Sequence, residues 1–292
     1  MFADVYCGRV YGSHLSIAGG MFKAVDAAVA LGLDTVQVFT KNQQQWAVPP
    51  LDPKAVEQWR EACDSAGFTQ TVSHDSYLIN LASPDAALRK KSVALMVEEI
   101  RRCDELGIPY LVMHPGAHMG EGEAKGLKTF TKALDQALAK RPTSTTIVCL
   151  ESTAGQGTSL GHRLEHLGEI IATSEHADRL GVCLDTAHLF AAGYDFRGRK
   201  YAGFKRELDA AVGLDRVKVW HLNDSKKDLG SRVDRHDHIG QGTIGDDGFR
   251  PIVRDKLWKS VPKIMETPKP KRDDGVDWDT VNVERLKQLA AR

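Results

Sequence analysis

The stretch LGIPYLVMHPG (106–116) contains the pattern that decides the fold. A helix-like segment ends at Leu106-Gly107, a short apolar run follows, and that run ends in His114. Glycine ends the helix because it adopts the left-handed conformation without a Cβ clash. The same junction recurs at four other glycines: Gly32, Gly67, Gly181 and Gly213. The chain is therefore predicted to alternate helices with strands.

Eight short apolar runs are the strand candidates, and they lack strict alternation, as parallel strands covered on both faces do. They span residues 9–14, 34–39, 69–74, 109–114, 145–151, 181–185, 216–222 and 262–266. Their ends lie roughly 35 residues apart, which matches one strand plus one helix. No linker rich in Ser, Gly or Pro and no charge block divides the chain. We therefore predict one α/β domain over 1–292, a single (β/α)8 TIM barrel; an open doubly wound sheet is the alternative.

Two segments between strands have clear helical periodicity. One face of the first carries Val56, Trp59, Cys63 and Ala66, and one face of the second carries Leu127, Phe130, Leu134 and Leu138. Ser83-Pro84 predicts the start of the long helix that ends at Gly107, with Ser83 as the N-cap and proline in the first helical position.

Composition excludes several classes of protein. The 292 residues are 42% hydrophobic and 27% charged, which excludes a disordered chain or a coiled coil. No apolar run approaches the roughly 18 residues of a membrane span, and the first residues lack the pattern of a secretion signal. Five widely spaced cysteines, never in a CxxC pair, indicate buried thiols in a reducing compartment, so we expect the cytoplasm. The 39 Lys+Arg and 39 Asp+Glu residues balance, which argues against a broad basic surface that coats nucleic acid.

Six successive strand candidates, the third to the eighth, end in a side chain that can bind a metal. These side chains are His74, His114, Glu151, Asp185, His221 and Glu266. His, Asp and Glu together are about one residue in six of this chain, so six such ends in a row are improbable by chance. In a (β/α)8 barrel the functional residues gather at the carboxyl ends of the strands. A single one of these residues would more often be a polar rim residue, but the six together indicate a site.

Three further residues extend the set. His188 follows the sixth strand by three residues, and Asp234-Arg-His236 is a D-x-H triplet in the long loop after the seventh strand. In extended conformation the two outer side chains of such a triplet point the same way, so they can grip one ion. Five histidines and four carboxylates without a thiolate suit Zn²⁺, and also Mn²⁺ or Fe²⁺. Nine ligands exceed what one ion accepts, so we expect two or three ions that share carboxylates.

Other motifs carry less weight. Gly240-x-Gly242-x-x-Gly245 matches a dinucleotide motif formally, but it follows polar residues instead of an apolar strand, so we interpret it as a loop. No Gly-x-Ser-x-Gly motif is present, and no cysteine has an obvious base partner, which argues against a side-chain nucleophile. His14, at the end of the first strand, is a candidate to orient a metal ligand.

The motifs resemble those of the endonuclease IV family, the zinc-dependent apurinic/apyrimidinic (AP) DNA endonucleases. The matching segments, in family order from SHLSIAGG (13–20) onward, are SHDSYLINLASP (73–84), MHPGAH (113–118), LESTAGQG (150–157), CLDTAHLFAAGYD (183–195), HLNDSKKDLGSRVDRHDHIGQGTIG (221–245) and METP (265–268). Two departures affect residues that are not ligands. Ala187 stands where the family usually has Cys, and Ser152 where it commonly has Asn.

The resemblance implies three zinc ions on a TIM barrel, with Mn²⁺ possible at some sites. It assigns His74, His114 and Glu151 to one ion. Glu151, Asp185, His221 and Glu266 hold the second, with Glu151 as the bridge. His188, Asp234 and His236 hold the third. Three dications would raise the charge of the chain from zero to about +6, focused at the barrel mouth.

The implied activity is hydrolysis of the phosphodiester bond 5′ to an abasic site in duplex DNA, leaving a 3′-hydroxyl and a 5′-deoxyribose phosphate, with trimming of 3′-blocking groups. Glu151 would also orient the attacking hydroxide. The candidate DNA contacts are Tyr77, Gln43, Gln44, Gln45 and Trp46, and Gln44 stands where some members carry Arg. We expect a monomer in the cytoplasm, associated with the nucleoid if the source is bacterial.

Two alternatives of other classes remain open. The first is a divalent-metal sugar isomerase or epimerase on a similar barrel, which would need at most two metals and a base or acid for proton or hydride transfer. The D-x-H triplet and the loop KNQQQW (41–46) speak against it. The second is a non-catalytic protein that binds damaged DNA. The intact set of nine ligands speaks against that, because loss of activity would leave the ligands free to change.

Overall fold

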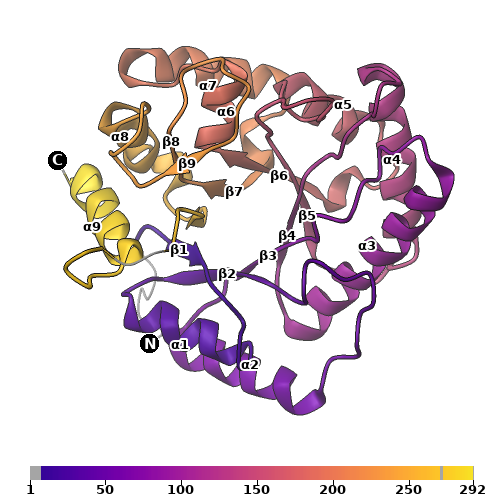
Figure 1. Ribbon diagram of the computed structural model, residues 1–292, viewed down its shortest axis with the longest axis horizontal. Coiled ribbons are helices and arrows are strands. Elements are labelled where there is room, and N and C mark those ends of the chain that lie inside the picture. The colour runs from indigo at the N-terminus through magenta and orange to yellow at the C-terminus, as the bar shows by residue number, and fades with distance from the viewer. Residues whose placement is uncertain (1–7, 270–271, 292) are drawn as a thin grey trace.

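Eight parallel strands close into a barrel in the computed structural model, which describes residues 8–269 and 272–291 (Figure 1). The strands are β1 (Tyr11–His14), β2 (Thr35–Phe39), β3 (Val72–His74), β4 (Tyr110–Met113), β5 (Ile147–Glu151), β6 (Leu180–Asp185), β7 (Val217–His221) and β10 (Lys263–Met265). Gly12 of β1 pairs with Thr35 on one side and Ile264 on the other, so no edge strand is left. The predicted TIM barrel is confirmed, and the open doubly wound sheet is wrong. The extent of the domain over the whole of 1–292 stays a prediction.

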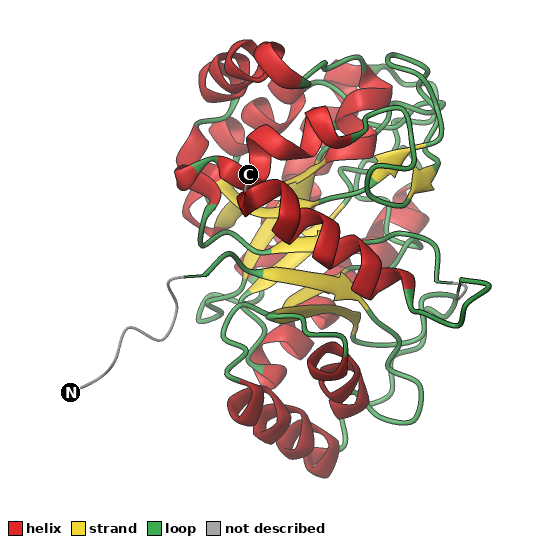
Figure 2. Cartoon of the chain, turned by 90° about the vertical axis from the view of Figure 1, so that its left-hand side faces the viewer, coloured by secondary structure: helices red, strands yellow, loops and turns green. Residues whose placement is uncertain are grey.

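Helices surround the strands, as both views show (Figures 1 and 2). They are α1 (Phe22–Ala30), α2 (Pro53–Ala66), α3 (Ala86–Leu106), α4 (Glu123–Ala139), α5 (Leu164–Thr173), α6 (Thr186–Ala192), α7 (Tyr201–Ala211), α8 (Asp246–Arg254) and α9 (Trp278–Ala291). The predicted inner face of α4 is fully buried, and Trp59 and Cys63 of α2 are buried as predicted. None of the described helices is long and apolar enough to cross a bilayer.

The interior of the barrel explains why the predicted ligands share one end. An apolar layer, one side chain from each of six strands, fills the barrel: Val72, Val112, Cys149, Cys183, Val219 and Ile264. Side chains alternate between the two faces of a strand, so the residue two positions further along points inward again. Those next residues are His74, His114, Glu151, Asp185, His221 and Glu266. The barrel therefore places a polar layer directly on its apolar core.

Two local predictions are wrong. Gly181 does not end a helix: α5 ends at Thr173, and Gly181 lies inside β6, where a Cβ atom would come within 2.5 Å of the Lys218 side chain. Its role is close packing between strands. Ser83 does not cap α3 either. Asp85 is the N-cap and accepts from the backbone N–H groups of Ala87 and Leu88, while Ser83 Oγ accepts from the N–H of Asp85.

A short hairpin after β7 carries the D-x-H triplet. Strands β8 (Asp224–Ser225) and β9 (His236–Asp237) pair antiparallel, and Asp234 lies in the loop between them. The buried carboxylate of Asp224 accepts from the backbone N–H groups of Ser225, Gly240, Ile244 and Gly245. The segment of residues 240–245 is a loop, as predicted, and its hydrogen bonds to Asp224, which the sequence did not predict, fix the position of the hairpin.

Four of the five cysteines are buried free thiols, as predicted: Cys63, Cys103, Cys149 and Cys183. Cys7 lies outside the described residues.

Candidate metal centre

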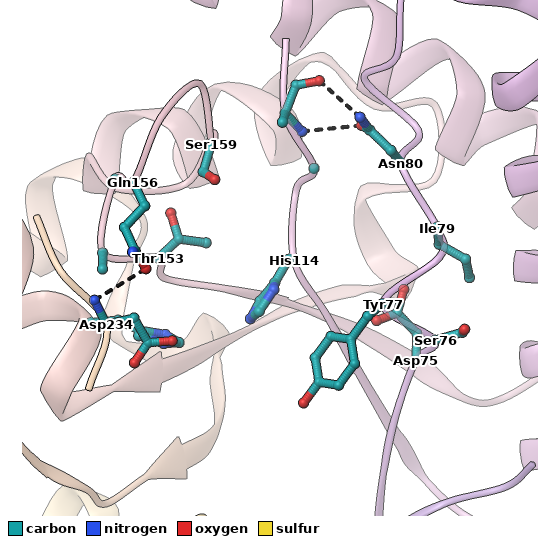
Figure 3. A pocket seen from close by; sticks show the side chains of 15 residues that line it. Asp75, Ser76, Tyr77, Ile79, Asn80, His114, Thr153, Gln156, Ser159 and Asp234 are labelled. Carbon is teal, nitrogen blue, oxygen red and sulfur yellow. Dashed lines mark hydrogen bonds and ion pairs between the residues drawn. The ribbon is translucent and has the colours of Figure 1, made fainter. Parts of the chain in front are cut away.

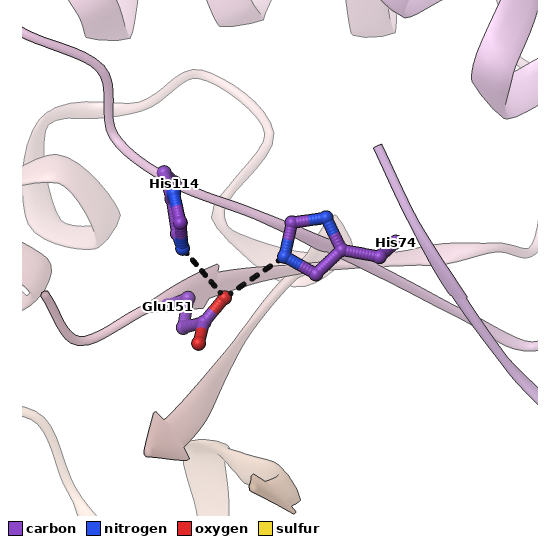
Figure 4. A group of neighbouring side chains, drawn as sticks. All are labelled: His74, His114 and Glu151. Atoms are coloured by element: carbon purple, nitrogen blue, oxygen red, sulfur yellow. Dashed lines mark hydrogen bonds and ion pairs between the residues drawn. The ribbon is translucent and has the colours of Figure 1, made fainter. Parts of the chain in front are cut away.

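Glu151 lies at the centre of the polar layer and is fully buried. Its Oε2 atom lies 3.1 Å from His74 Nε2 and 3.0 Å from His114 Nε2 (Figure 4). Its Oε1 atom lies 3.0 Å from His221 Nδ1 and 3.3 Å from His188 Nδ1. The two oxygens of one carboxylate therefore face two different pairs of imidazoles.

A second group shares this carboxylate. His221 Nδ1 lies 3.1 Å from Glu266 Oε2 and 3.9 Å from Asp185 Oδ2. One ligand atom from each of Glu151, Asp185, His221 and Glu266 can be chosen so that all lie within 4.8 Å of one another. The same holds for His74, His114 and Glu151. Both groups are those predicted from the sequence, and both contain Glu151.

The third group joins the hairpin to the barrel. Asp234 Oδ2 lies 3.1 Å from His188 Nε2, and its Oδ1 lies 3.1 Å from His236 Nε2. His236 Nε2 also lies 3.7 Å from Asp185 Oδ2. Asp185 therefore faces both the second and the third group, a contact that the sequence did not predict. All nine predicted ligands come together at one end of the barrel.

Four of the histidines are oriented as metal ligands usually are. One ring nitrogen of each faces an oxygen outside the cluster: Asp75 O for His74 at 3.0 Å, Ser152 O for His188 at 2.8 Å, Gln37 Oε1 for His221 at 2.8 Å, and Glu266 O for His236 at 3.2 Å. A proton on that nitrogen leaves the other nitrogen free to bind a cation. The buried His236 Nε2 lies 3.1 Å from Asp234 Oδ1 but without the angles of a hydrogen bond. The donor set therefore fits metal ions.

The charges at the site lead to the same conclusion. Burial alone would raise the pKa of Glu151, but the imidazoles of His221 and His114 hold it well below its usual range. His221 holds the pKa of Glu266 low against burial in the same way. Burial would lower the pKa of His236, yet two neighbouring aspartates raise it to about 9. In the protein alone, protons on histidines balance ionised carboxylates, and divalent cations would supply that positive charge instead.

Two supporting residues were missed in the sequence. Gln37 is fully buried; besides its contact with His221, its Nε2 donates to Glu266 Oε1 at 2.6 Å. Asn223 Nδ2 donates to Asp185 Oδ2 at 2.6 Å, and Asn223 Oδ1 accepts from the N–H of Glu266. The only available signal was a polar residue within or just after an apolar run. His14, the predicted orienting residue, does contact Glu266, with Nδ1 3.1 Å from Oε1.

A cavity of about 310 Å³ opens beside the cluster (Figure 3). It is lined by three of the predicted ligands, His114, His188 and Asp234, and by Tyr77. Figure 3 shows Tyr77 and Asp234 on either side of His114. The Tyr77 side chain is 65% exposed although its ring lies against the imidazole of His74, with centroids 5.6 Å apart. An exposed aromatic ring at the edge of this cavity is available to a ligand.

The predicted loop residues lie beside this cavity without lining it. Ser76 Oγ donates to the carbonyl oxygen of Gln43 at 3.1 Å, which joins the loop to the segment that carries Tyr77. The side chains of Gln44, Gln45 and Trp46 are exposed. The backbone of the loop therefore lies at the mouth of the barrel. The side chains of Gln44, Gln45 and Trp46 do not reach into the cavity beside the metal ligands.

Comparison with known proteins identifies the family. The chain is 48% identical over 280 residues to the probable endonuclease 4 of Chloroflexus aurantiacus, and the match covers 96% of this chain and 97% of that protein. It is 46% identical to the probable endonuclease 4 of Geobacter sulfurreducens, with 96% and 94% covered. The chain belongs to the endonuclease IV family. The resemblance found in the sequence motifs is confirmed.

The fold comparisons agree with membership of the endonuclease IV family. Residues 25–289 match the family described as a xylose isomerase-like TIM barrel. The crystal structure of endonuclease IV from Thermus thermophilus is similar at 36% identity, with a TM-score of 0.84 and coverage of 97% of this chain and 99% of that one. A D-tagatose 3-epimerase-like protein also matches, with a TM-score of 0.74, but at 20% identity this likeness shows the fold alone.

Membership of the endonuclease IV family makes the chain a nuclease of DNA repair. The two alternatives kept open from the sequence, a sugar isomerase and a non-catalytic binder, are therefore set aside. The buried His, Asp and Glu clusters indicate that this nuclease binds metal.

Proposed function

We propose that this nuclease hydrolyses the phosphodiester bond 5′ to an abasic site in duplex DNA and leaves a 3′-hydroxyl and a 5′-deoxyribose phosphate. The observation that carries the proposal is the position of the cavity. It touches the metal-ligand cluster at His114, His188 and Asp234 and is bordered by the exposed ring of Tyr77. A sugar without a base costs less to rotate out of the duplex than an intact nucleotide, so a small cavity favours it.

We assign the nine ligands to three ions. His74, His114 and Glu151 would hold the first. Glu151, Asp185, His221 and Glu266 would hold the second, and His188, Asp234 and His236 the third. Zinc suits a set of imidazoles and carboxylates, with Mn²⁺ an acceptable substitute at some positions. When bound, the ions would lower the pKa of a water molecule and neutralise charge on the phosphate.

The residues of the chain position the reacting groups. The carboxylate of Glu151 is ionised and buried between two pairs of imidazoles, so it can orient the attacking water through a hydrogen bond. Asp234 and His236 reach the cluster from the hairpin, where they would help to hold an ion that neutralises charge on the leaving 3′-oxygen. Tyr77 borders the cavity, and the loop Gln43–Trp46 is joined to the segment that carries Tyr77, so we assign both to contacts with the bases that flank the abasic site.

The same geometry supports removal of 3′-blocking groups, because a phosphate at a 3′ end presents the same ester bond to the same ligands. We further propose that the protein acts as a monomer in the cytoplasm, at the nucleoid in a bacterial cell.

A chelation experiment tests the proposal. The substrate is a duplex oligonucleotide with one tetrahydrofuran abasic analogue, and the undamaged duplex is the control. The parent protein should cut 5′ to the analogue, lose that activity after prolonged chelation, and regain it when zinc is restored. Asp234→Asn should lower the rate at least about 100-fold, whereas Asp228→Asn, an exposed position in the same hairpin, should not. A cut that survives chelation, or equal rates for the two variants, would contradict the proposal.

A further inference from the structure

A basic groove lies on the outer wall of the barrel, between α3 and α4. The two helices pack side by side (Figure 1), and the groove between them has a volume of about 860 Å³. Six cationic side chains line it, against a single carboxylate, that of Glu121. The six are Arg89, Lys90, Lys125, Lys128, Lys132 and Lys140. In a chain with no formal net charge, this is a local concentration of positive charge.

Most of these cations have no carboxylate partner. Lys125 pairs with Glu121. Among the described residues, no carboxylate lies within ion-pair distance of Lys90, Lys128 or Lys132, and their side chains are exposed. Cations that are not neutralised within the protein are available to an external anion.

The two loops that line part of the cavity at the metal centre lead into the two helices that form the groove. The loops after β3 and β4 run together, because Asn80 Nδ2 donates to Ala117 O at 3.0 Å and Asn80 Oδ1 accepts from the N–H of Ala117 at 3.1 Å. Both residues line the cavity at the cluster. A few residues further along the same two loops, Pro84 and Glu121 line the start of the groove. The same two loops therefore contribute residues to the cavity and to the groove.

The dimensions and the chemistry of the groove fit a DNA backbone. Lys125, Lys128 and Lys132 follow one face of α4, and Lys140 follows its last residue. From Lys125 to Lys140 the helix rises about 22 Å, the length of about six base pairs of duplex. No aromatic side chain is among the described residues that line the groove, whereas protein partners usually bind where aromatic residues gather.

We propose that the groove between α3 and α4 binds backbone phosphates of the substrate duplex several base pairs away from the cut. This inference rests on the proposed function, since it extends the DNA path that begins at the metal centre. Its contribution is to binding alone, because none of the six cations lines the cavity in which the ester bond would be cut.

A pair of charge-reversal variants tests the inference. Lys128→Glu with Lys132→Glu changes the groove; Lys256→Glu with Lys287→Glu, on the 3-10 turn Lys256–Trp258 and on α9, makes the same change of net charge elsewhere. Both pairs are exposed, and thermal unfolding checks that each variant folds. The substrates carry an abasic analogue with about 5 or about 15 base pairs on each side.

With the long duplex, the groove variant should show a KM about tenfold above that of the parent and a kcat within about twofold. The slope of log KM against log salt concentration should be smaller for the groove variant than for the parent, by about 2. With the short duplex, parent and groove variant should agree, and the control variant should match the parent on both. Equal KM values for the groove and control variants, or no gain by the parent from the longer duplex, would overturn the inference.

Fluorescence anisotropy of the same duplexes measures binding without cutting, so it separates the two proposals. Loss of the proposed function would appear as binding without incision by the parent. Failure of the groove inference would appear as normal incision with equal affinity of all three proteins for the long duplex.

Discussion

Gln37 and Asn223 hold two of the candidate metal ligands, His221 and Asp185, in position by hydrogen bonds. Nine candidate ligands could be named from the sequence because each ends a recognisable apolar run or lies in a short motif. Gln37 and Asn223 could not be named from the sequence, because an amide side chain does not by itself indicate a metal site. Their contacts with His221 and Asp185 also depend on the register between strands far apart in the chain. The sequence therefore revealed the groups that can bind metal but not the groups that orient them.

Gln37 gives the first prediction at this scale. It accepts the N–H of His221 and donates to Glu266, so Gln37→Ala should leave both ligands less well oriented. The affinity of the second metal position should fall about 10- to 100-fold. Competition with a chromophoric zinc chelator measures this affinity. Gln45→Ala, at an exposed loop position, is the control, and equal affinities for the two variants would contradict the role given to Gln37.

The strands of the barrel were predicted in type and number, whereas the ends of the elements and the hairpin of β8 and β9 were not. The eight barrel strands and the helical faces follow from hydrophobic pattern, which extends over many residues. The start of α3 depends on which of two neighbouring polar residues accepts the first N–H groups. Asp85 does so instead of Ser83, because its carboxylate reaches two of them and favours the positive end of the helix dipole.

The hairpin that carries Asp234 and His236 provides a prediction at the scale of an element. Asp224→Ala would leave the N–H groups of Gly240, Ile244 and Gly245 without their acceptor in a buried loop. The free energy of unfolding should fall by about 2 to 4 kcal/mol, measured by urea denaturation. The number of bound metals should fall as well, since the hairpin supplies two ligands. Asp228→Ala should change neither quantity, and a stable Asp224→Ala variant would contradict this account of the loop.

At the scale of the whole molecule, the buried Lys263 predicts how stability changes with pH. Its side chain is 1% exposed, and Nζ donates to the carbonyl oxygen of Val261 at 2.8 Å. Burial lowers the pKa of Lys263 to about 7. The unfolded chain keeps this proton up to a pH of about 10.4. Between these values the unfolded state binds more protons, so the free energy of unfolding should rise with pH, by up to about 1.4 kcal/mol per unit.

Lys263→Met tests this dependence. Urea denaturation at about pH 7, 8.5 and 10 should show a smaller rise for the variant than for the parent, because methionine carries no proton to lose. Below about pH 7 the lysine is protonated in both states of the parent, so no further difference in slope is expected there. If the free energy of unfolding changed equally with pH in the two proteins across the whole range, the buried Lys263 amine would not be neutral as proposed.

The balance of charge over the whole molecule also acquires a different meaning. Zero formal charge argued only against a uniformly basic surface. The structure concentrates carboxylates and imidazoles at the barrel mouth, and lysines in the groove between α3 and α4. Metal ions at the barrel mouth and unpaired lysines in the groove would each attract phosphate. A chain with no net charge can therefore bind a polyanion at defined positions.

Metal content is the most direct test of the central claim, that nine converging side chains hold three ions. Elemental analysis of the purified protein, with the protein concentration taken from amino-acid analysis, should give about three zinc equivalents per chain. The double variant Asp234→Ala with His236→Ala should give about two, because the third group alone is affected and loses two of its three ligands. Two equivalents or fewer in the parent, or the same content in parent and double variant, would contradict the account.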